Sequence, residues 1–137
     1  MADQELFTLI KSELTAAIPV MEAILTEWEN ASEEKAPECM ERYTEQIQRI
    51  DKVMQMLELD GLQEICVQLE TNTMTLADQA LPLEVKTLLA QWPQLMIDYL
   101  DHPGEADSCQ NLIIHFQNSD WPIGLDDDSA YELITQL

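Results

Sequence analysis

Apolar residues recur every three or four positions through most of this chain, which is the spacing of one face of an α-helix. Glycine is scarce, with three residues, and β-branched residues are sparse among Leu, Met, Glu, Gln and Ala. That composition favours helices over sheets. The longest run, residues 3–30, carries apolar side chains at Leu6, Leu9, Ile10, Leu14, Ala17, Met21, Ile24 and Trp28.

Prolines and turn residues divide this pattern into separate predicted helices. The predicted helices cover residues 3–30, 37–59, 62–79, 83–100 and 106–117, and a short last helix opens at 129. Ser129 and Glu132 have the spacing of a capping box. The Asp60-Gly61 pair predicts a tight turn. Pro19 predicts a kink or short break, and Pro93 a kink, inside the first and fourth helices.

Long helices with short connections predict an all-α fold. We expect an antiparallel four-helix bundle in residues 1–104, with short additional C-terminal helices in residues 105–137 packed on the bundle. At 137 residues the chain is the size of one domain.

The charge of the chain excludes several classes of partner. The formal charge is −21, with only six Lys and Arg. Such an acidic surface repels the phosphates of nucleic acids and anionic lipid headgroups, so we expect neither nucleic acid nor membrane as a partner. The most apolar run, 16–25, is interrupted by Pro19 and Glu22 and is too short to span a bilayer.

The cysteines and the N-terminal sequence predict a cytoplasmic protein. Cys39, Cys66 and Cys109 form no CxxC motif and are expected to be buried, unpaired and apolar in role. The first residues have neither the basic nor the apolar region of a signal peptide.

Motifs for catalysis or cofactor binding are missing from the sequence. It has no glycine-rich phosphate loop, no zinc spacing of Cys and His, and no repeated Glu-x-x-His of di-metal bundles. His102 is predicted to be exposed at a helix end and His115 to be partly buried. Residues 126–128, all Asp, are predicted to stabilise the start of the last helix, not to bind calcium. No cofactor and no metal are expected.

Half of the basic residues lie on the second predicted helix, at Arg42, Arg49 and Lys52. Their spacing puts them on adjoining parts of one face. They either neutralise acidic neighbours or form a small positive island suited to an acidic partner site. Met56 lies off the apolar stripe and is the best candidate for an exposed contact. Most other methionines fit core stripes, namely Met21, Met40, Met54 and Met96.

The same helix carries a resemblance to a known family. Its sequence is Ile47-Gln48-Arg49-Ile50-Asp51-Lys52-Val53-Met54-Gln55-Met56-Leu57-Glu58-Leu59. It resembles the active helix of histidine phosphotransfer (Hpt) domains, whose motif is His-x-x-Lys-Gly. It is similar to the N-terminal Hpt-like region of the ChpA/PilL-type hybrid chemosensory histidine kinases, which control type IV pili and twitching motility. The Gln-Met-Leu-Glu-Leu string is the most specific part. The segment 88–100 also looks like that group's Leu-x-Gln-Leu-Pro-x-Tyr-Leu segment, and the likeness spans residues 6–137.

The departures from the motif determine what the resemblance implies. Gln48 occupies the histidine position, and a carboxamide cannot form a phosphoramidate. Asp51 stands in place of the lysine and repels an incoming phosphoryl group. Lys52 replaces the glycine and adds bulk where a partner must approach closely. The resemblance therefore implies a phosphotransfer fold without phosphotransfer, and a domain that is not an enzyme.

Three hypotheses for function follow. The first is a docking or scaffold module of a chemosensory signal-transduction kinase, so that the chain is a fragment of a longer protein. It would bind a pilus-regulating protein or another domain of the same kinase through a helix face with Gln48, Arg49, Lys52 and Met56. The second is a phosphotransfer protein that uses His115 or His102. The third is an unrelated acidic helical adaptor.

Overall fold

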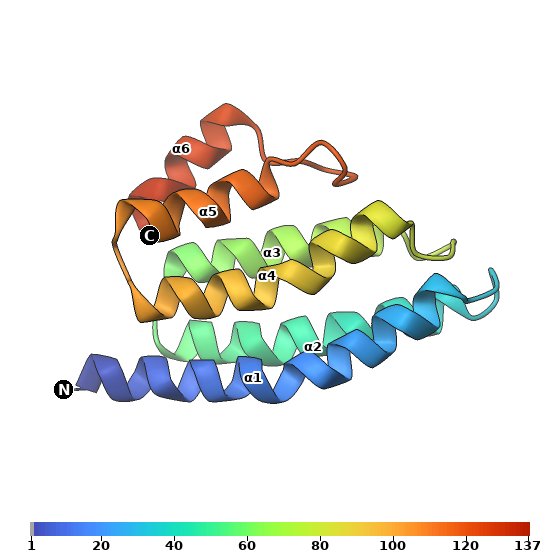
Figure 1. The fold of residues 1–137 in the computed structure, drawn as a ribbon, viewed down its shortest axis with the longest axis horizontal. Coiled ribbons are helices and arrows are strands. Elements are labelled where there is room, and N and C mark those ends of the chain that lie inside the picture. The colour runs from blue at the N-terminus through green and yellow to red at the C-terminus, as the bar shows by residue number, and fades with distance from the viewer. Residues whose placement is uncertain (1) are drawn as a thin grey trace.

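The computed structural model describes the backbone of residues 2–137 and the side chains from Glu5 onward. These residues form helices and no strand, so the all-α prediction is confirmed. Successive helices run in alternate directions (Figure 1). The helices are α1 (Ala2–Glu29), α2 (Ala36–Met56), α3 (Asp60–Met74), α4 (Leu83–Asp101), α5 (Ala106–Phe116) and α6 (Asp127–Gln136).

In Figure 1 the helices lie in layers, with α1 and α2 at the bottom, α3 and α4 at the middle level, and α5 below α6 at the top. Helix α1 packs on α2 and α4, and α2 packs on α3. Among the described residues, no Cα atom of α3 lies within 8 Å of a Cα atom of α4. Instead α6 packs on α3, and α5 packs on α4 and on α6. The last two helices therefore close the open side of the first four.

One buried apolar cluster runs through all of these layers. It includes Leu14 of α1, Ile47 of α2 and Trp92 of α4, and also Phe116 of α5 and Leu133 of α6. The C-terminal helices thus share the core of the bundle. The division of the chain between residues 104 and 105 stays a prediction.

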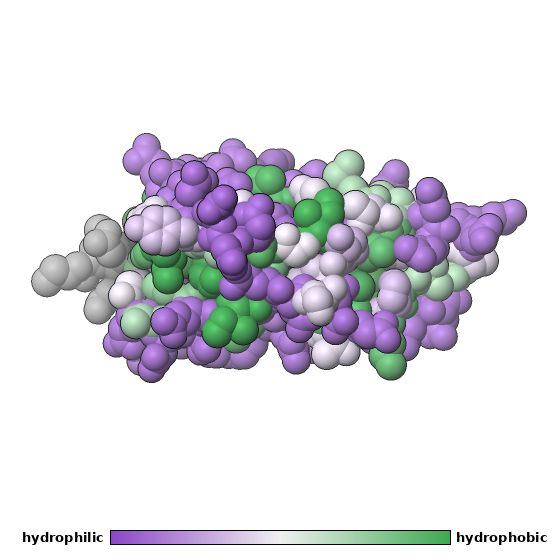
Figure 2. All heavy atoms as spheres, turned by 90° about the horizontal axis from the view of Figure 1, so that it is seen from above, coloured by the Kyte–Doolittle hydropathy of each residue, from purple (hydrophilic) through white to green (hydrophobic). Residues whose placement is uncertain are grey.

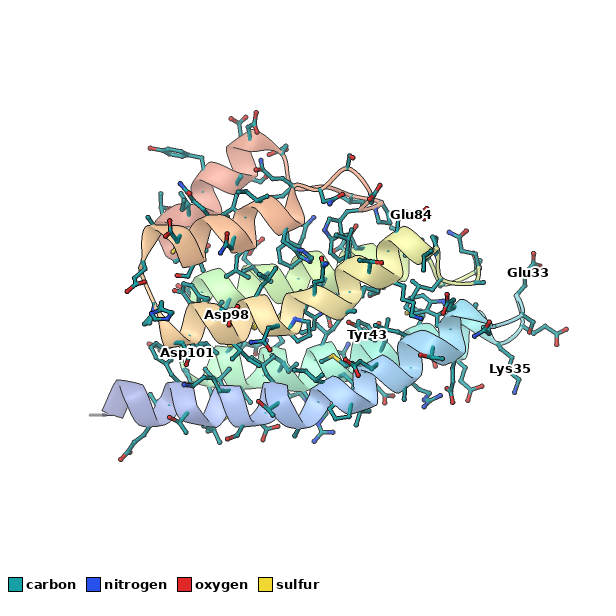
Figure 3. The ribbon with its side chains drawn as sticks, viewed as in Figure 1. Glu33, Lys35, Tyr43, Glu84, Asp98 and Asp101 are labelled. Carbon is teal, nitrogen blue, oxygen red and sulfur yellow. The ribbon has the colours of Figure 1, made fainter. Side chains whose placement is uncertain are left out.

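Helix α4 continues through Pro93. A proline has no N–H, so the carbonyl of Leu89, four residues earlier, loses its partner within the helix. The hydroxyl of Tyr43 donates to this carbonyl at 3.1 Å and accepts from Nε1–H of Trp92 at 2.9 Å. Figure 3 shows Tyr43 between α2 and α4. Helix α1 is also continuous, through Pro19, and both helices bend along their length in Figure 1.

The end of α2 differs from the prediction. The helix ends at Met56, and Glu58 adopts a left-handed conformation with φ 55°. The backbone N–H of Leu59 bonds the carbonyl of Met54 at 3.0 Å, and that of Glu58 bonds Gln55 at 3.1 Å. This is a Schellman motif, which satisfies the last carbonyls of the helix. The turn therefore precedes the Asp60-Gly61 pair, which instead opens α3.

Helix α3 ends at Met74, earlier than predicted. The hydroxyls of Thr73 and Thr75 bond carbonyls three residues earlier, at 2.9 and 2.7 Å, and such bonds compete with helix continuation. In addition, Trp28 of α1 donates through Nε1 to the carbonyl of Gln79 at 3.0 Å. Its own carbonyl accepts from the N–H of Leu81 at 3.2 Å. These two hydrogen bonds to Trp28 fix the connection between α3 and α4 in a non-helical conformation.

The predicted capping box at Ser129 and Glu132 is wrong. Helix α6 begins at Asp127, and the carboxylate of Asp126 caps it by accepting from the N–H of Ser129 at 2.7 Å. This hydrogen bond lowers the pKa of Asp126. Asp127 and Asp128 lie in the first turn, where the helix dipole favours acidic residues. The predicted contribution of these three aspartates to the start of the last helix is confirmed.

The predicted placements of cysteines, histidines and methionines are confirmed. All three cysteines are buried and free, and burial raises the pKa of the Cys66 thiol. His102 is exposed at the C-terminal end of α4, and His115 is buried. Met21, Met54 and Met96 are buried, and Met40 is half-buried against the core. Within residues 2–137, no helix combines the length and the apolar character that a bilayer crossing requires.

Candidate docking surface

The outer face of α2 holds all of the predicted contact residues. The buried side chains of this helix lie on one stripe, formed by Ala36, Cys39, Tyr43, Ile47, Ile50 and Met54. Gln48, Lys52 and Met56 follow one another at steps of four residues, so they form a row along the opposite side. These three residues and Arg49 are all exposed, and Met56 is 81% accessible. The helix therefore presents the four side chains to solvent together.

Shallow grooves flank this row on both sides. Gln48 borders a groove with Thr44 and with Met74 of α3. Arg49, about 100° further around the helix, borders another groove with Ala17 and Val20 of α1. Met74 and Val20 are exposed apolar side chains. The row thus offers polar groups along its length and apolar surface at its edges, which is the mixture found at protein interfaces.

The amide of Gln48 interacts with a carboxylate on the neighbouring helix. Burial raises the pKa of Glu70 on α3, and the nearby charge of Asp51 raises it further. A hydrogen bond from the Gln48 side chain opposes this shift, because it stabilises the ionised carboxylate. The amide at the motif's histidine position therefore acts on the charge of a carboxylate on α3 while it stays exposed.

Asp51 is half-buried, and its charge acts on Glu70 of α3. Its Oδ2 accepts from the Gln55 amide at 2.9 Å, whereas its buried Oδ1 has no hydrogen-bond partner among the described residues. Its negative charge also contributes to the raised pKa of Cys66. The residue at the motif's lysine position therefore adds negative potential between α2 and α3, where a phosphoryl group would be repelled.

The predicted positive island on α2 contains fewer unpaired basic residues than the sequence suggests. Arg42 forms an ion pair with Glu27 of α1, as expected for a residue that neutralises an acidic neighbour. Lys11 pairs with Asp101 at 2.7 Å and Lys86 with Glu29 at 2.5 Å. Of the chain's six basic residues, three therefore remain without an ion pair in the described structure: Lys35, Arg49 and Lys52. Two of these lie on the outer face of α2.

The alternative phosphoacceptors differ in accessibility. Nε2 of His115 lies 3.0 Å from the carbonyl oxygen of Leu88, and the ring packs edge-on against Trp121. Burial lowers the pKa of His115. His102 is exposed, with Nδ1 3.5 Å from the Glu105 carboxylate. His115 is therefore buried and hydrogen-bonded in the core, whereas His102 is accessible to solvent.

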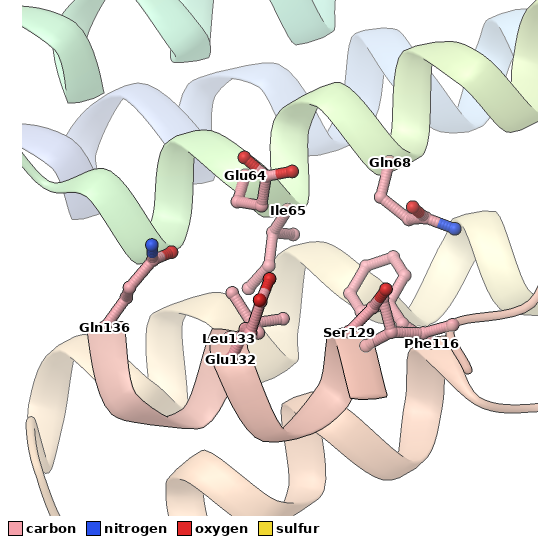
Figure 4. A pocket seen from close by; sticks show the side chains of 9 residues that line it. Glu64, Ile65, Gln68, Phe116, Ser129, Glu132, Leu133 and Gln136 are labelled. Carbon is pink, nitrogen blue, oxygen red and sulfur yellow. The ribbon is translucent and has the colours of Figure 1, made fainter. Parts of the chain in front are cut away.

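A further groove lies between α3 and α6 and was not predicted. It has a volume of about 200 Å³ and includes Glu64 and Ile65 of α3 and Glu132 and Leu133 of α6 (Figure 4). Its existence depends on the contact between these two helices, for which the sequence gives no local signal. Gly61 makes that contact possible, because a Cβ atom there would lie 2.9 Å from the carbonyl oxygen of Gln136.

In the part of the chain that the structure describes, no group of three or more His, Cys, Asp and Glu side chains is placed to hold a metal ion. Comparisons with protein-family models, with curated proteins and with solved structures gave no match.

Proposed function

We propose that this chain is a non-catalytic docking module of a chemosensory signalling kinase, related to the Hpt-like region of the kinases that control type IV pili. The observation that supports this proposal most directly is the position of Gln48. Its side chain is exposed on the outer face of α2, where the resemblance assigns a phosphate-accepting histidine. An amide at that site can donate and accept hydrogen bonds but cannot attack phosphorus.

The surroundings of Gln48 support the same proposal. Asp51 brings a negative charge close to it, and Lys52 occupies the position of the small motif residue. Arg49, Lys52 and Met56 provide free cations and an exposed thioether for a protein partner. The partner is a pilus-regulating protein or another domain of the same kinase. The proposed location is the cytoplasm, in keeping with the free cysteines and the chemosensory resemblance.

A gain-of-function experiment tests the absence of phosphotransfer. A phosphorylated receiver domain is mixed with the wild-type chain and with the triple variant Q48H/D51K/K52G, which restores the motif. We expect acid-labile phosphate on the variant and none on the wild type. Labelling of the wild-type chain on His102 or His115 would overturn the proposal in favour of the second hypothesis.

The docking face is tested by substitution. Photo-crosslinking from position 52 in the native cell identifies the partner. Binding of that partner is then measured with the quadruple variant Q48A/R49A/K52A/M56A. We expect a loss of at least about tenfold, equivalent to about 1.4 kcal/mol. The control Q91A/Q94A changes two exposed residues of α4 and should bind normally. Equal affinities for both variants would exclude this face.

A further inference from the structure

We infer that the groove between α3 and α6 binds a lysine or arginine side chain presented by a partner protein. This inference concerns a different surface from the outer face of α2 and is independent of the function proposed above. It rests on the lining of the groove, on its size and on the distribution of charge over the chain.

The floor of the groove is apolar. Ile65, Phe116 and Leu133 are buried core residues, and Leu125 is half-buried against them. They come from α3, α5, α6 and the connection before α6, so the floor is made of packed elements. Such a surface suits the methylene stem of a long side chain, because lysine and arginine bury their stems while the charged ends stay near water.

The rim of the groove carries two glutamates among neutral polar side chains. Glu64 and Glu132 are exposed and belong to opposite walls. In Figure 4 the carboxylate of Glu132 extends from α6 toward α3, where Glu64 is located. Neither glutamate has an ion pair among the described residues. A cationic group between these walls gains charge-assisted hydrogen bonds that the chain itself does not supply.

The size of the groove favours a single side chain over a cofactor. Small-molecule sites have volumes of about 300 to 1,000 Å³. The α3–α6 groove has about 200 Å³ and is open to solvent. A protein partner that inserts one long side chain fits this space, and further contacts are available nearby. Exposed apolar side chains of α6 include Tyr131 and Ile134, and Figure 2 shows apolar surface among polar groups on this side.

The charge of the whole chain excludes the opposite kind of ligand. The formal charge is −21, and the cations without an ion pair lie on α2 or on the connection before it. None of them lines this groove. An anionic ligand would meet two carboxylates and a negative field, whereas a cationic segment is attracted from a distance.

The test uses an acetylated Gly/Ser decapeptide with one central lysine, and the same peptide with norleucine, which keeps the stem and lacks the ammonium group. Amide chemical shifts of the ¹⁵N-labelled chain are followed during titration. We expect the lysine peptide to shift resonances of residues 64–68 and 129–136, and the norleucine peptide to shift them at least about tenfold more weakly.

Matched charge variants separate a specific site from the general field. E64Q/E132Q should lower the affinity for the lysine peptide at least about tenfold, equivalent to about 1.4 kcal/mol. The control E33Q/E34Q removes the same charge from the connection between α1 and α2, and Figure 3 shows Glu33 at the far end of the molecule. This control should change the affinity for the lysine peptide less than about twofold. Equal losses in both variants, equal binding of both peptides, or no shifts at the groove would overturn the inference. The variant Q48A/R49A/K52A/M56A leaves the groove intact and should bind the lysine peptide as the wild type does. A failure of the groove test can therefore be told apart from a failure of the docking-face test.

Discussion

The missing N–H of Pro93 explains one buried hydrogen bond between α2 and α4. It leaves the carbonyl of Leu89 without a helical partner, and the hydroxyl of Tyr43 supplies one. The same hydroxyl accepts from Trp92, so one side chain satisfies two buried polar groups of α4. The buried proline of α4 is thereby coupled to a specific residue of α2.

The variant Y43F tests this coupling. It leaves the Leu89 carbonyl and the Trp92 N–H buried without partners, and an unsatisfied buried group costs about 1–3 kcal/mol. We expect the free energy of unfolding in urea to fall by at least about 1 kcal/mol. Y131F, which removes a hydroxyl from a side chain that is 73% exposed, serves as the control. Equal stability of the two variants would contradict the assigned role of Tyr43.

His115 makes stability depend on pH. Burial lowers its pKa below the usual value of 6.5. The unfolded chain therefore takes up a proton at a higher pH than the folded chain does. The contribution of His115 to stability is complete above pH 6.5 and is lost as the pH falls from there through the folded pKa. Urea unfolding at several pH values should show a weaker loss toward acid in H115Q than in the wild type. Parallel pH profiles would contradict the prediction.

The end of α2 combines a favourable hydrogen-bond pattern with an unfavourable residue. Glu58 has φ 55°, a conformation that costs a residue with a Cβ atom roughly 1–2 kcal/mol. The Schellman bonds of Leu59 and Glu58 hold it there. We therefore expect E58G to raise the free energy of unfolding by about 0.5–1 kcal/mol.

Two controls define this prediction for thermal and urea unfolding. E58A keeps the Cβ atom and should not stabilise the chain. E41G places glycine at an exposed position inside α2 and should destabilise it by about 1 kcal/mol. A loss of stability in E58G would show that the wild-type residue is not strained.

The helices were predictable because their signals are local, and their packing was not. Apolar spacing predicted the longer helices and the exposed Met56. The end of α2 was missed because hydrogen bonds outweigh the poor fit of Glu58. Gly61 was interpreted as a turn residue, whereas its missing Cβ accommodates α6.

The candidate docking surface also combines features that local sequence signals predict with contacts between helices that they do not. All four residues of the outer face of α2 follow from helical periodicity. The ion pair of Arg42 with Glu27 and the contact of Gln48 with Glu70 join different helices. The groove between α3 and α6 exists only because residues far apart in the sequence come together. Such contacts leave no periodic trace in the sequence, and they determine which charges of a face are free.

At the scale of the whole molecule, like charge acts against the fold. The formal charge of −21 means that folding brings many carboxylates closer together, and the ion pairs of Lys11, Arg42 and Lys86 are partly exposed. Exposed pairs contribute at most about 1 kcal/mol each.

The screening length falls from about 30 Å at 0.01 M salt to about 8 Å at 0.15 M. We therefore expect the urea midpoint to rise over this range of NaCl, because repulsion is screened more than the few pairs are weakened. E33Q/E34Q should raise the midpoint at low salt and have less effect at high salt. A midpoint that falls with salt would mean that attractive pairs dominate the electrostatics of this chain.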